Sequence, residues 1–119
     1  MLVLTQEQIQ AFNEMMRKSF EERLLAHLRK HFPQQTARMP EPFLRSRIRQ
    51  EIATAEEHGI TSECEVAAYV SIAFNVSPQA PAIYLEPVRA ALESPDSSSQ
   101  KVRRLLSFAE SQSNHPIYT

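Results

Sequence analysis

Glycine is almost missing from this sequence: Gly59 is the only one among 119 residues, and there is no tryptophan. Phosphate-binding loops and nucleophile elbows need several glycines at fixed spacing, so this scarcity excludes both motifs. The acidic pairs Glu21–Glu22 and Glu56–Glu57 are expected on polar helix faces, away from any pocket. We therefore expect no enzymatic activity and no cofactor.

The sequence also lacks a charge excess and long apolar runs. Its net charge is -1, with 23% charged and 42% hydrophobic residues, which is typical of globular proteins that do not bind polyanions. No run is long enough to span a membrane, and "MLVLTQEQIQ" has neither the basic start nor the apolar length of a signal peptide. We expect one cytoplasmic domain covering residues 1–119, without nucleic-acid or membrane partners.

Cysteine is nearly absent as well. Cys64 is alone, so it cannot form an internal disulfide. It would lie in the first turn of a helix, where a thiol can be activated, but no base is close in sequence. We expect it to act as a small apolar residue.

What the sequence does contain is helical periodicity, beginning with a long helix from Thr5 to about Phe32. Thr5 and Gln8 have capping-box spacing, and Pro33 ends the helix. Its apolar residues recur almost always every four positions, so the stripe winds around the helix by roughly 40° per step. The stripe consists of Ile9, Phe12, Met16, Phe20, Leu24, Leu28 and Phe32.

A polar, proline-rich connection of about ten residues, "PQQTARMPEP", precedes a second helix that starts near Pro42. The apolar face of this amphipathic helix is predicted to contain Leu44, Ile48, Ile52 and Ala55. The other faces are predicted to contain Arg45, Arg47, Arg49, Glu51, Glu56 and Glu57.

A short connection at residues 58 to 62, which we call the joint, follows this helix. Gly59 stands where a left-handed residue ends a helix without a Cβ clash. Ser62 and Glu65 have reciprocal capping spacing, and Ile60 can pack against Val66. The joint therefore predicts a fixed angle between two helices.

The helix after the joint, roughly Ser62 to Asn75, is apolar on every side and should be the centre of the core. Prolines then break regularity over 76–87, where Ile83, Tyr84 and Leu85 lie on an irregular or one-turn segment. A short helix from Glu86 to Glu93 is predicted next. The last helix has Ser97 and Gln100 at capping spacing and a core-facing stripe of Val102, Leu105, Leu106 and Ala109, and residues 113–119 form a loose tail. The predicted fold is all-α, with four to five helices.

Two clusters could carry chemistry. His27 and His31 are four apart, as metal ligands on a helix can be, but no third ligand is near, so we expect two exposed histidines and no metal. "RSRIRQ" places three arginines in a row, but acidic neighbours at four-residue spacing favour a solvated face over a nucleic-acid interface.

Two stretches, "FEERLLAHLRKHFP" and "IRQEIATAEEHGITSECEVAAYVSIAF", resemble small helical proteins encoded in type VI secretion loci beside adaptor chaperones. The most specific element of the resemblance is the joint "AEEHGITSECEVAAYV". The resemblance implies a co-chaperone that binds an adaptor chaperone, a secreted effector, or both. After the central helix, where the family has a glycine and an acidic-aromatic loop, this chain has Asn75, Val76, Ser77 and Pro78.

Two alternatives stay open at this point: an immunity or antitoxin-like binder of a toxin, and a DNA-binding regulator that uses the arginine-rich helix. For a protein-binding function, the length of the first helix matters. A helix from Thr5 to Phe32 would be about 42 Å long, whereas a 119-residue domain is about 35 Å across, so part of the helix should overhang. We expect an apolar patch for an adaptor or a second copy of the chain, formed by Phe12, Met16, Phe20 and Tyr84.

Overall fold

The computed structural model describes residues 5 to 113, and every regular element in that range is a helix. The all-α prediction is confirmed. The helices are α1 (Gln6–His31), α2 (Pro33–Thr36), α3 (Glu41–Glu57), α4 (Glu63–Val76), the 3-10 turn η1 (Ala82–Tyr84), α5 (Glu86–Glu93) and α6 (Ser98–Ser113).

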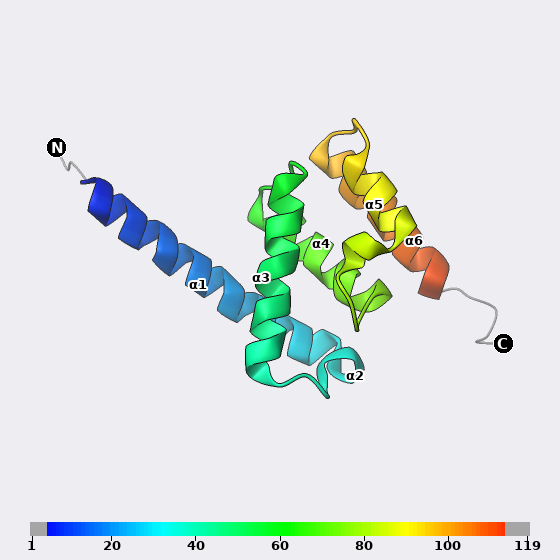
Figure 1. Ribbon diagram of the computed structural model, residues 1–119, viewed down its shortest axis with the longest axis horizontal. Coiled ribbons are helices and arrows are strands. Elements are labelled where there is room, and N and C mark those ends of the chain that lie inside the picture. The colour runs from blue at the N-terminus through cyan, green and yellow to red at the C-terminus, as the bar shows by residue number, and fades with distance from the viewer. Residues whose placement is uncertain (1–4, 114–119) are drawn as a thin grey trace.

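Helix α4 is the centre of the body, as its apolar composition predicted. It packs against α3, α6, α1 and η1, so its side chains have neighbours on all sides (Figure 1). Its buried residues are Val66, Tyr69, Val70, Ile72, Ala73 and Phe74. The apolar surface that these residues remove from water is the main contribution of α4 to stability.

Helix α1 belongs to the body only in its C-terminal half. The predicted capping box is present: Thr5 Oγ1 accepts from the Gln8 N–H at 3.2 Å, and the Thr5 N–H donates to Gln8 Oε1 at 2.8 Å. Leu24, Leu25 and Leu28 are buried, whereas every residue from 5 to 19 is exposed. This exposed half projects from the body (Figure 1), and the molecule measures 62 × 36 × 21 Å. The predicted overhang is confirmed.

The connection between α1 and α3 is more ordered than expected. Pro33 does end α1, but it also occupies the first turn of α2, where its missing N–H costs nothing. The Arg29 guanidinium donates to the backbone carbonyls of Thr36 and Met39 and so holds this turn against α1. The predicted connection therefore contains one helical turn, and these carbonyls find a donor on the preceding helix.

The joint between α3 and α4 has the predicted geometry. Gly59 has φ = 84°, and the Ile60 N–H donates to the Ala55 carbonyl at 2.9 Å, which together form a Schellman cap. Ser62 Oγ accepts from the Glu65 N–H at 3.2 Å, which starts α4. Ile60 is completely buried and Val66 nearly so, and both belong to the hydrophobic core on either side of the joint.

Glu65 has a different role from the one expected. Its carboxylate accepts from the Ser62 hydroxyl at 3.1 Å and from the Ser98 and Ser99 hydroxyls, both at 2.9 Å, and not from the Ser62 N–H. These hydrogen bonds, Ser99 first and Ser98 next, lower the pKa of Glu65. Glu65 therefore ties the start of α6 to the joint, which the capping-box spacing alone did not indicate.

Helices α5 and α6 follow the sequence prediction with one correction. Glu86–Glu93 is the predicted short helix, and Ser97 and Gln100 cap each other as expected, at 3.2 and 3.3 Å. Leu106, predicted to face the core, is 47% exposed, because α6 packs on α4 and α5 with a narrower face. Ser113 ends α6, and the rest of the predicted loose tail lies outside the described residues.

Candidate functional site

An ion pair lies in the middle of the body, where the sequence predicted solvated side chains. Arg47 and Glu51 are one helical turn apart on α3, their side chains are 5% and 1% exposed, and Arg47 Nη2 lies 2.8 Å from Glu51 Oε2. The guanidinium also stacks over the Phe74 ring at 4.8 Å. The prediction that both residues face solvent was wrong, because α4 and the segment after it cover this side of α3.

The pair is fully hydrogen-bonded, which is what makes its burial tolerable. Glu51 accepts from the Tyr69 hydroxyl at 3.1 Å and from the Ala82 N–H at 3.0 Å. Arg47 donates to the Ser77 carbonyl at 2.7 Å. Burial raises the pKa of Tyr69, with the Glu51 carboxylate as a second cause, so its hydroxyl stays a donor. Within residues 5 to 113, no buried side-chain nitrogen or oxygen lacks a partner.

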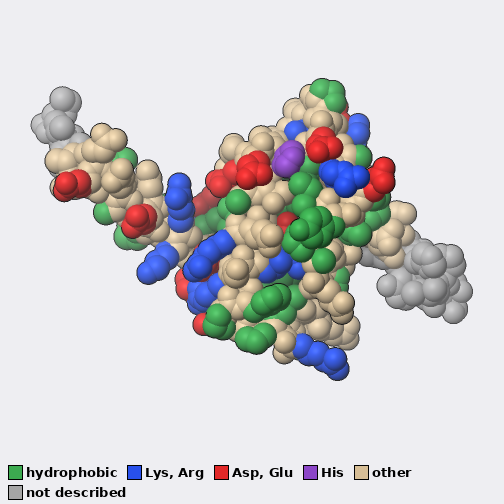
Figure 2. Space-filling view, in the orientation of Figure 1, with side chains coloured by type: hydrophobic (Ala, Val, Ile, Leu, Met, Phe, Trp, Pro, Cys, Tyr) green, Lys and Arg blue, Asp and Glu red, His purple; other side chains and the backbone are tan. Residues whose placement is uncertain are grey.

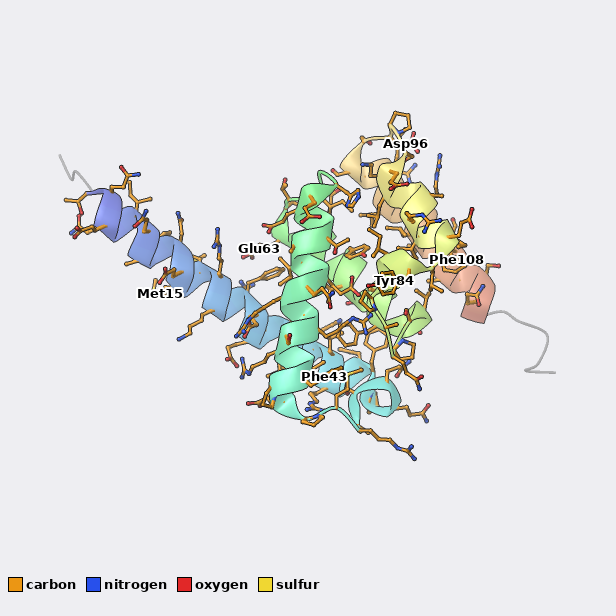
Figure 3. The ribbon with its side chains drawn as sticks, viewed as in Figure 1. Met15, Phe43, Glu63, Tyr84, Asp96 and Phe108 are labelled. Atoms are coloured by element: carbon orange, nitrogen blue, oxygen red, sulfur yellow. The ribbon has the colours of Figure 1, made fainter. Side chains whose placement is uncertain are left out.

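This network fixes the proline-rich segment 77–84, which carries Tyr84 at its end. The Ser77 hydroxyl donates to the Ala80 carbonyl at 2.6 Å, and the Tyr84 N–H donates to the Pro81 carbonyl at 3.1 Å. Tyr84 itself is 72% exposed and extends from η1 on the surface of the body (Figure 3). A rigid segment therefore presents an aromatic side chain to solvent.

The projecting half of α1, residues 5 to 19, is a second apolar surface, which we call the arm. Ile9, Phe12, Met15 and Met16 are 46%, 53%, 58% and 41% exposed. At 100° per residue they lie within a sector about 120° wide, and all four charges of the arm lie outside it. These charges are Glu7, Glu14, Arg17 and Lys18. The arm is an amphipathic helix whose apolar face is not buried by any other part of the described chain.

An open groove of about 990 Å³ lies at the base of the arm, between α1, α3 and the start of α4. Its apolar lining comes from Met16 and Phe20 on α1, Ile52 on α3 and Val66 on α4. Arg49 and Glu21 in its lining form an ion pair at 2.6 Å, and Glu63 in its lining pairs at 3.2 Å with Arg23, which lies outside it. Charged residues of all three helices also line the groove, among them Glu14, Glu56 and Glu63, so Met16 belongs both to the apolar face of the arm and to a concave surface of mixed character.

The four residues expected to form one patch lie on two separate surfaces. Phe12 and Met16 are exposed on the arm, and Phe20 is half-buried at its base. Tyr84 lies across the body, with α3 between it and the arm (Figures 1 and 3). Hydrophobic side chains also gather on the body, beside α3 and at its lower end (Figure 2). Met15 and Phe43 are both 58% exposed and lie outside the recurring apolar stripes of the sequence.

The acidic pair Glu21–Glu22 connects α1 to α3. Glu21, predicted on a polar face, is buried and pairs with Arg45 at 3.0 Å and Arg49 at 2.6 Å. Glu22 pairs with Arg45 at 2.6 Å. The hydrogen bond from Arg49 is the largest cause of a lowered pKa of Glu21, against which burial acts. The prediction for Glu21 was wrong because its partners are 24 and 28 positions away.

These contacts also bear on nucleic-acid binding. Arg45 and Arg49 are engaged by acidic side chains of α1, and Arg47 is buried with Glu51. Nucleic-acid interfaces need basic side chains that are free to reach phosphates. The row of three arginines therefore offers little support for the DNA-binding alternative.

The residues considered for metal or thiol chemistry, His27, His31 and Cys64, are not among the residues that define the arm or the Tyr84 surface. The His27 and His31 rings lie 4.5 Å apart and both side chains are exposed. In the described part of the chain, no group of three potential ligands can hold a metal ion. Cys64 is exposed at the start of α4, so the expectation of a small apolar role was wrong; the first turn of α4 faces outward.

Two further observations concern the class of protein to which this chain could belong. Among the helices of residues 5 to 113, none has both the length and the apolar character needed to cross a bilayer. No family model, curated protein or solved structure matches this chain. The candidate site is therefore defined by geometry alone, as the arm with its groove and the Tyr84 surface.

Proposed function

We propose that this chain is a non-enzymatic protein-binding factor that acts as a co-chaperone in type VI secretion, and that Tyr84 anchors an adaptor chaperone or its effector. The observation that carries the proposal is the rigid presentation of Tyr84. An aromatic side chain that is 72% exposed sits on a segment held by the buried Arg47–Glu51 pair.

Protein interfaces are dominated by a few anchors of this type. Tyrosine gives a large contact area with little conformational entropy to lose, and its hydroxyl can hydrogen-bond at the rim. A fixed backbone lowers the ordering cost of binding further. The buried pair makes little net contribution to stability compared with an apolar pair, so its value would lie in fixing this segment.

The resemblance of residues 20–33 and 48–74 to co-chaperones of type VI secretion supplies the kind of partner. In the structure these two stretches form the base of α1, the end of α3 and α4, which together carry the body. The resemblance thus concerns the scaffold, and Tyr84 lies on the segment where this chain departs from the family.

The test is co-purification with a tagged adaptor chaperone encoded in the same secretion locus. We expect Tyr84→Glu to abolish co-purification and Gln79→Glu to leave it at the wild-type level. Gln79 is the matched control, since it is exposed on the same segment and receives the same charge. Unchanged helical content by circular dichroism should accompany both variants.

Two results would contradict the proposal. If the wild-type chain does not co-purify with the adaptor or with the adaptor–effector pair, the function is wrong. If Tyr84→Glu still binds like the wild type, the function can stand, but Tyr84 is not the anchor.

A further inference from the structure

The arm has the composition of an interface core. Its apolar face, formed by Ile9, Phe12, Met15 and Met16, is exposed and contains no charge. Its four charged residues lie on the opposite side of the helix. Protein interfaces are depleted of charge at their centre and enriched in aromatic residues and methionine, as this face is. An isolated helix of this length is marginal in water, so burying the apolar face of the arm against a partner would stabilise it.

Ile9 and Met15 lie symmetrically about Phe12, whereas the counterpart of Met16 is Gln8. Ile9 stands three positions before Phe12 and Met15 three positions after it. Thr5 stands seven positions before Phe12, and Ser19 seven positions after it. A twofold axis through Phe12 would therefore place Phe12 against its own copy, Ile9 against Met15, and uncharged residues at both ends. A self-complementary face of this kind is what an isologous dimer requires.

The length of the arm fits the same arrangement. Fifteen helical residues span about 22 Å, so with the axis at Phe12 the tip of one arm reaches the base of the other. At that base lies the open groove of about 990 Å³, whose lining combines apolar residues such as Phe20 and Ile52 with charged residues of α1, α3 and α4. The two bodies then lie at opposite ends of the paired arms and do not collide.

We propose that the arms of two copies pair antiparallel about Phe12 to form a homodimer. The inference goes beyond the proposed function, because Tyr84 lies on the body and stays free in the dimer. Each copy contributes four large apolar side chains from the arm, whereas a standard interface has roughly 20–30 residues a side. The dimer is therefore expected to dissociate on dilution.

The first experiment measures the mass of the full chain by sedimentation equilibrium from about 1 µM to about 1 mM, the range where interfaces of this size dissociate. We expect twice the 13.6 kDa of one chain at the upper end. Phe12→Glu should stay monomeric throughout. Gln10→Glu is the matched control, since it adds the same charge on the charged side of the same arm, and it should dimerise like the wild type.

The second experiment tests the direction of pairing in a Cys64→Ser background. The Ile9→Cys and Met15→Cys variants are mixed and oxidised with copper phenanthroline. Antiparallel arms should give mainly the mixed disulfide dimer, whereas parallel arms would join like variants. Because Ile9 and Met15 are exposed on the arm and Cys64 is exposed at the start of α4, the substitutions should leave the fold intact, which circular dichroism checks.

Three results would overturn the inference. They are a wild-type chain that is monomeric at about 1 mM, dimers that Phe12→Glu does not dissociate, and disulfides only between like variants. If the wild type is monomeric alone and Phe12→Glu loses the adaptor in co-purification, the arm is covered by the adaptor. Tyr84→Glu should leave the mass measured by sedimentation equilibrium the same as that of the wild type. Failure of this inference and failure of the proposed function can therefore be told apart.

Discussion

At the scale of single residues, Glu51 holds the centre of the buried hydrogen-bond network. It is completely buried, and its carboxylate meets an arginine, a tyrosine hydroxyl and a backbone N–H. A buried pair of this type contributes little net stability, but losing one partner leaves an uncompensated charge in the core. The pair is thus a strict structural requirement for the segment that carries Tyr84.

We expect Glu51→Ala to destabilise the protein by about 3–5 kcal/mol, because Arg47 would stay buried without its partner. Denaturant-induced unfolding measures the change. Glu57→Ala, an exposed change on the same helix, should stay within about 0.5 kcal/mol of the wild type. Replacing both partners, Arg47→Met with Glu51→Leu, should recover only part of the loss, because the Tyr69 hydroxyl, the Ala82 N–H and the Ser77 carbonyl would be buried without these partners. A small effect of Glu51→Ala alone would show that the pair is not buried.

The ion pairs of Glu21 give stability a dependence on pH. Its pKa is lowered in the folded state from 4.5, first by the hydrogen bond from Arg49. A lowered folded pKa adds stability above the unfolded pKa, and this stability is lost as the pH falls through the folded value. We expect the denaturant midpoint to fall as the pH drops below about 4.5, and to fall less in Glu21→Gln. Equal pH profiles for both proteins would contradict this assignment.

At the scale of elements, the joint at residues 58 to 62 sets the angle between α3 and α4. Gly59 has φ = 84°, and apart from Gly59 itself and its two chain neighbours no atom lies within 4 Å of the position that a Cβ would take. The cost of a side chain there is therefore conformational and not steric. Both flanking helices are anchored by the bonds that this conformation allows.

We expect Gly59→Ala to destabilise the protein by roughly 1 kcal/mol, since L-residues pay about this cost in the left-handed region. Gly59→Asn should cost less, because asparagine tolerates this conformation. Thermal or denaturant unfolding of the three proteins gives the comparison. Equal losses for alanine and asparagine would mean that crowding, and not the φ angle, sets the cost.

The elements themselves were predictable because their signals are local. Caps at Thr5, Ser62 and Ser97 lie within three residues of their partners, and Gly59 closes α3 through bonds to its last turn. The bounds of α5 were likewise marked by Pro87 and the serines after Glu93.

The partners of charged side chains were not predictable in the same way. Glu21, Arg47 and Glu51 bind groups 18 to 31 positions away, and helical periodicity carries no information about such contacts. For the same reason the sequence could not separate Tyr84 from Phe12, since the path of residues 76–87 decides on which side of α3 Tyr84 emerges. The overhang of α1 was predictable, because helix length and domain diameter follow from residue counts.

At the scale of the whole molecule, the protein consists of a packed body and one projecting arm (Figure 1). The Cα radius of gyration is 15.9 Å, against roughly 13 to 14 Å for a compact chain of this length. The arm accounts for the excess, since residues 5 to 19 bury none of their side chains against the body. Paired arms would give a dimer with two widely separated Tyr84 side chains.

Deleting residues 1–13 should leave the body's free energy of unfolding unchanged within about 0.5 kcal/mol, because residues 5 to 13, the described part of this segment, are exposed and exposed residues contribute little. The measurement is urea-induced unfolding at low micromolar concentration, where wild-type dimers dissociate. At high concentration the wild-type midpoint should rise while that of the truncated chain stays constant. A large loss of stability at low concentration would show that the arm packs on its own body.

Lys101 has a consequence for the order in which the molecule assembles. A cation in the first turn of a helix is unfavourable, but this ammonium group leaves α6 and donates to the His58 carbonyl at the end of α3, at 2.8 Å. The contact spans 43 residues, so a long loop must close before it can form, whereas α3 and α4 meet across a joint of a few residues. Lys101 therefore belongs to the late steps of folding. Removing the Lys101 ammonium group should speed unfolding and leave the folding rate almost unchanged. This one side chain would then slow the release of α6 from the folded protein.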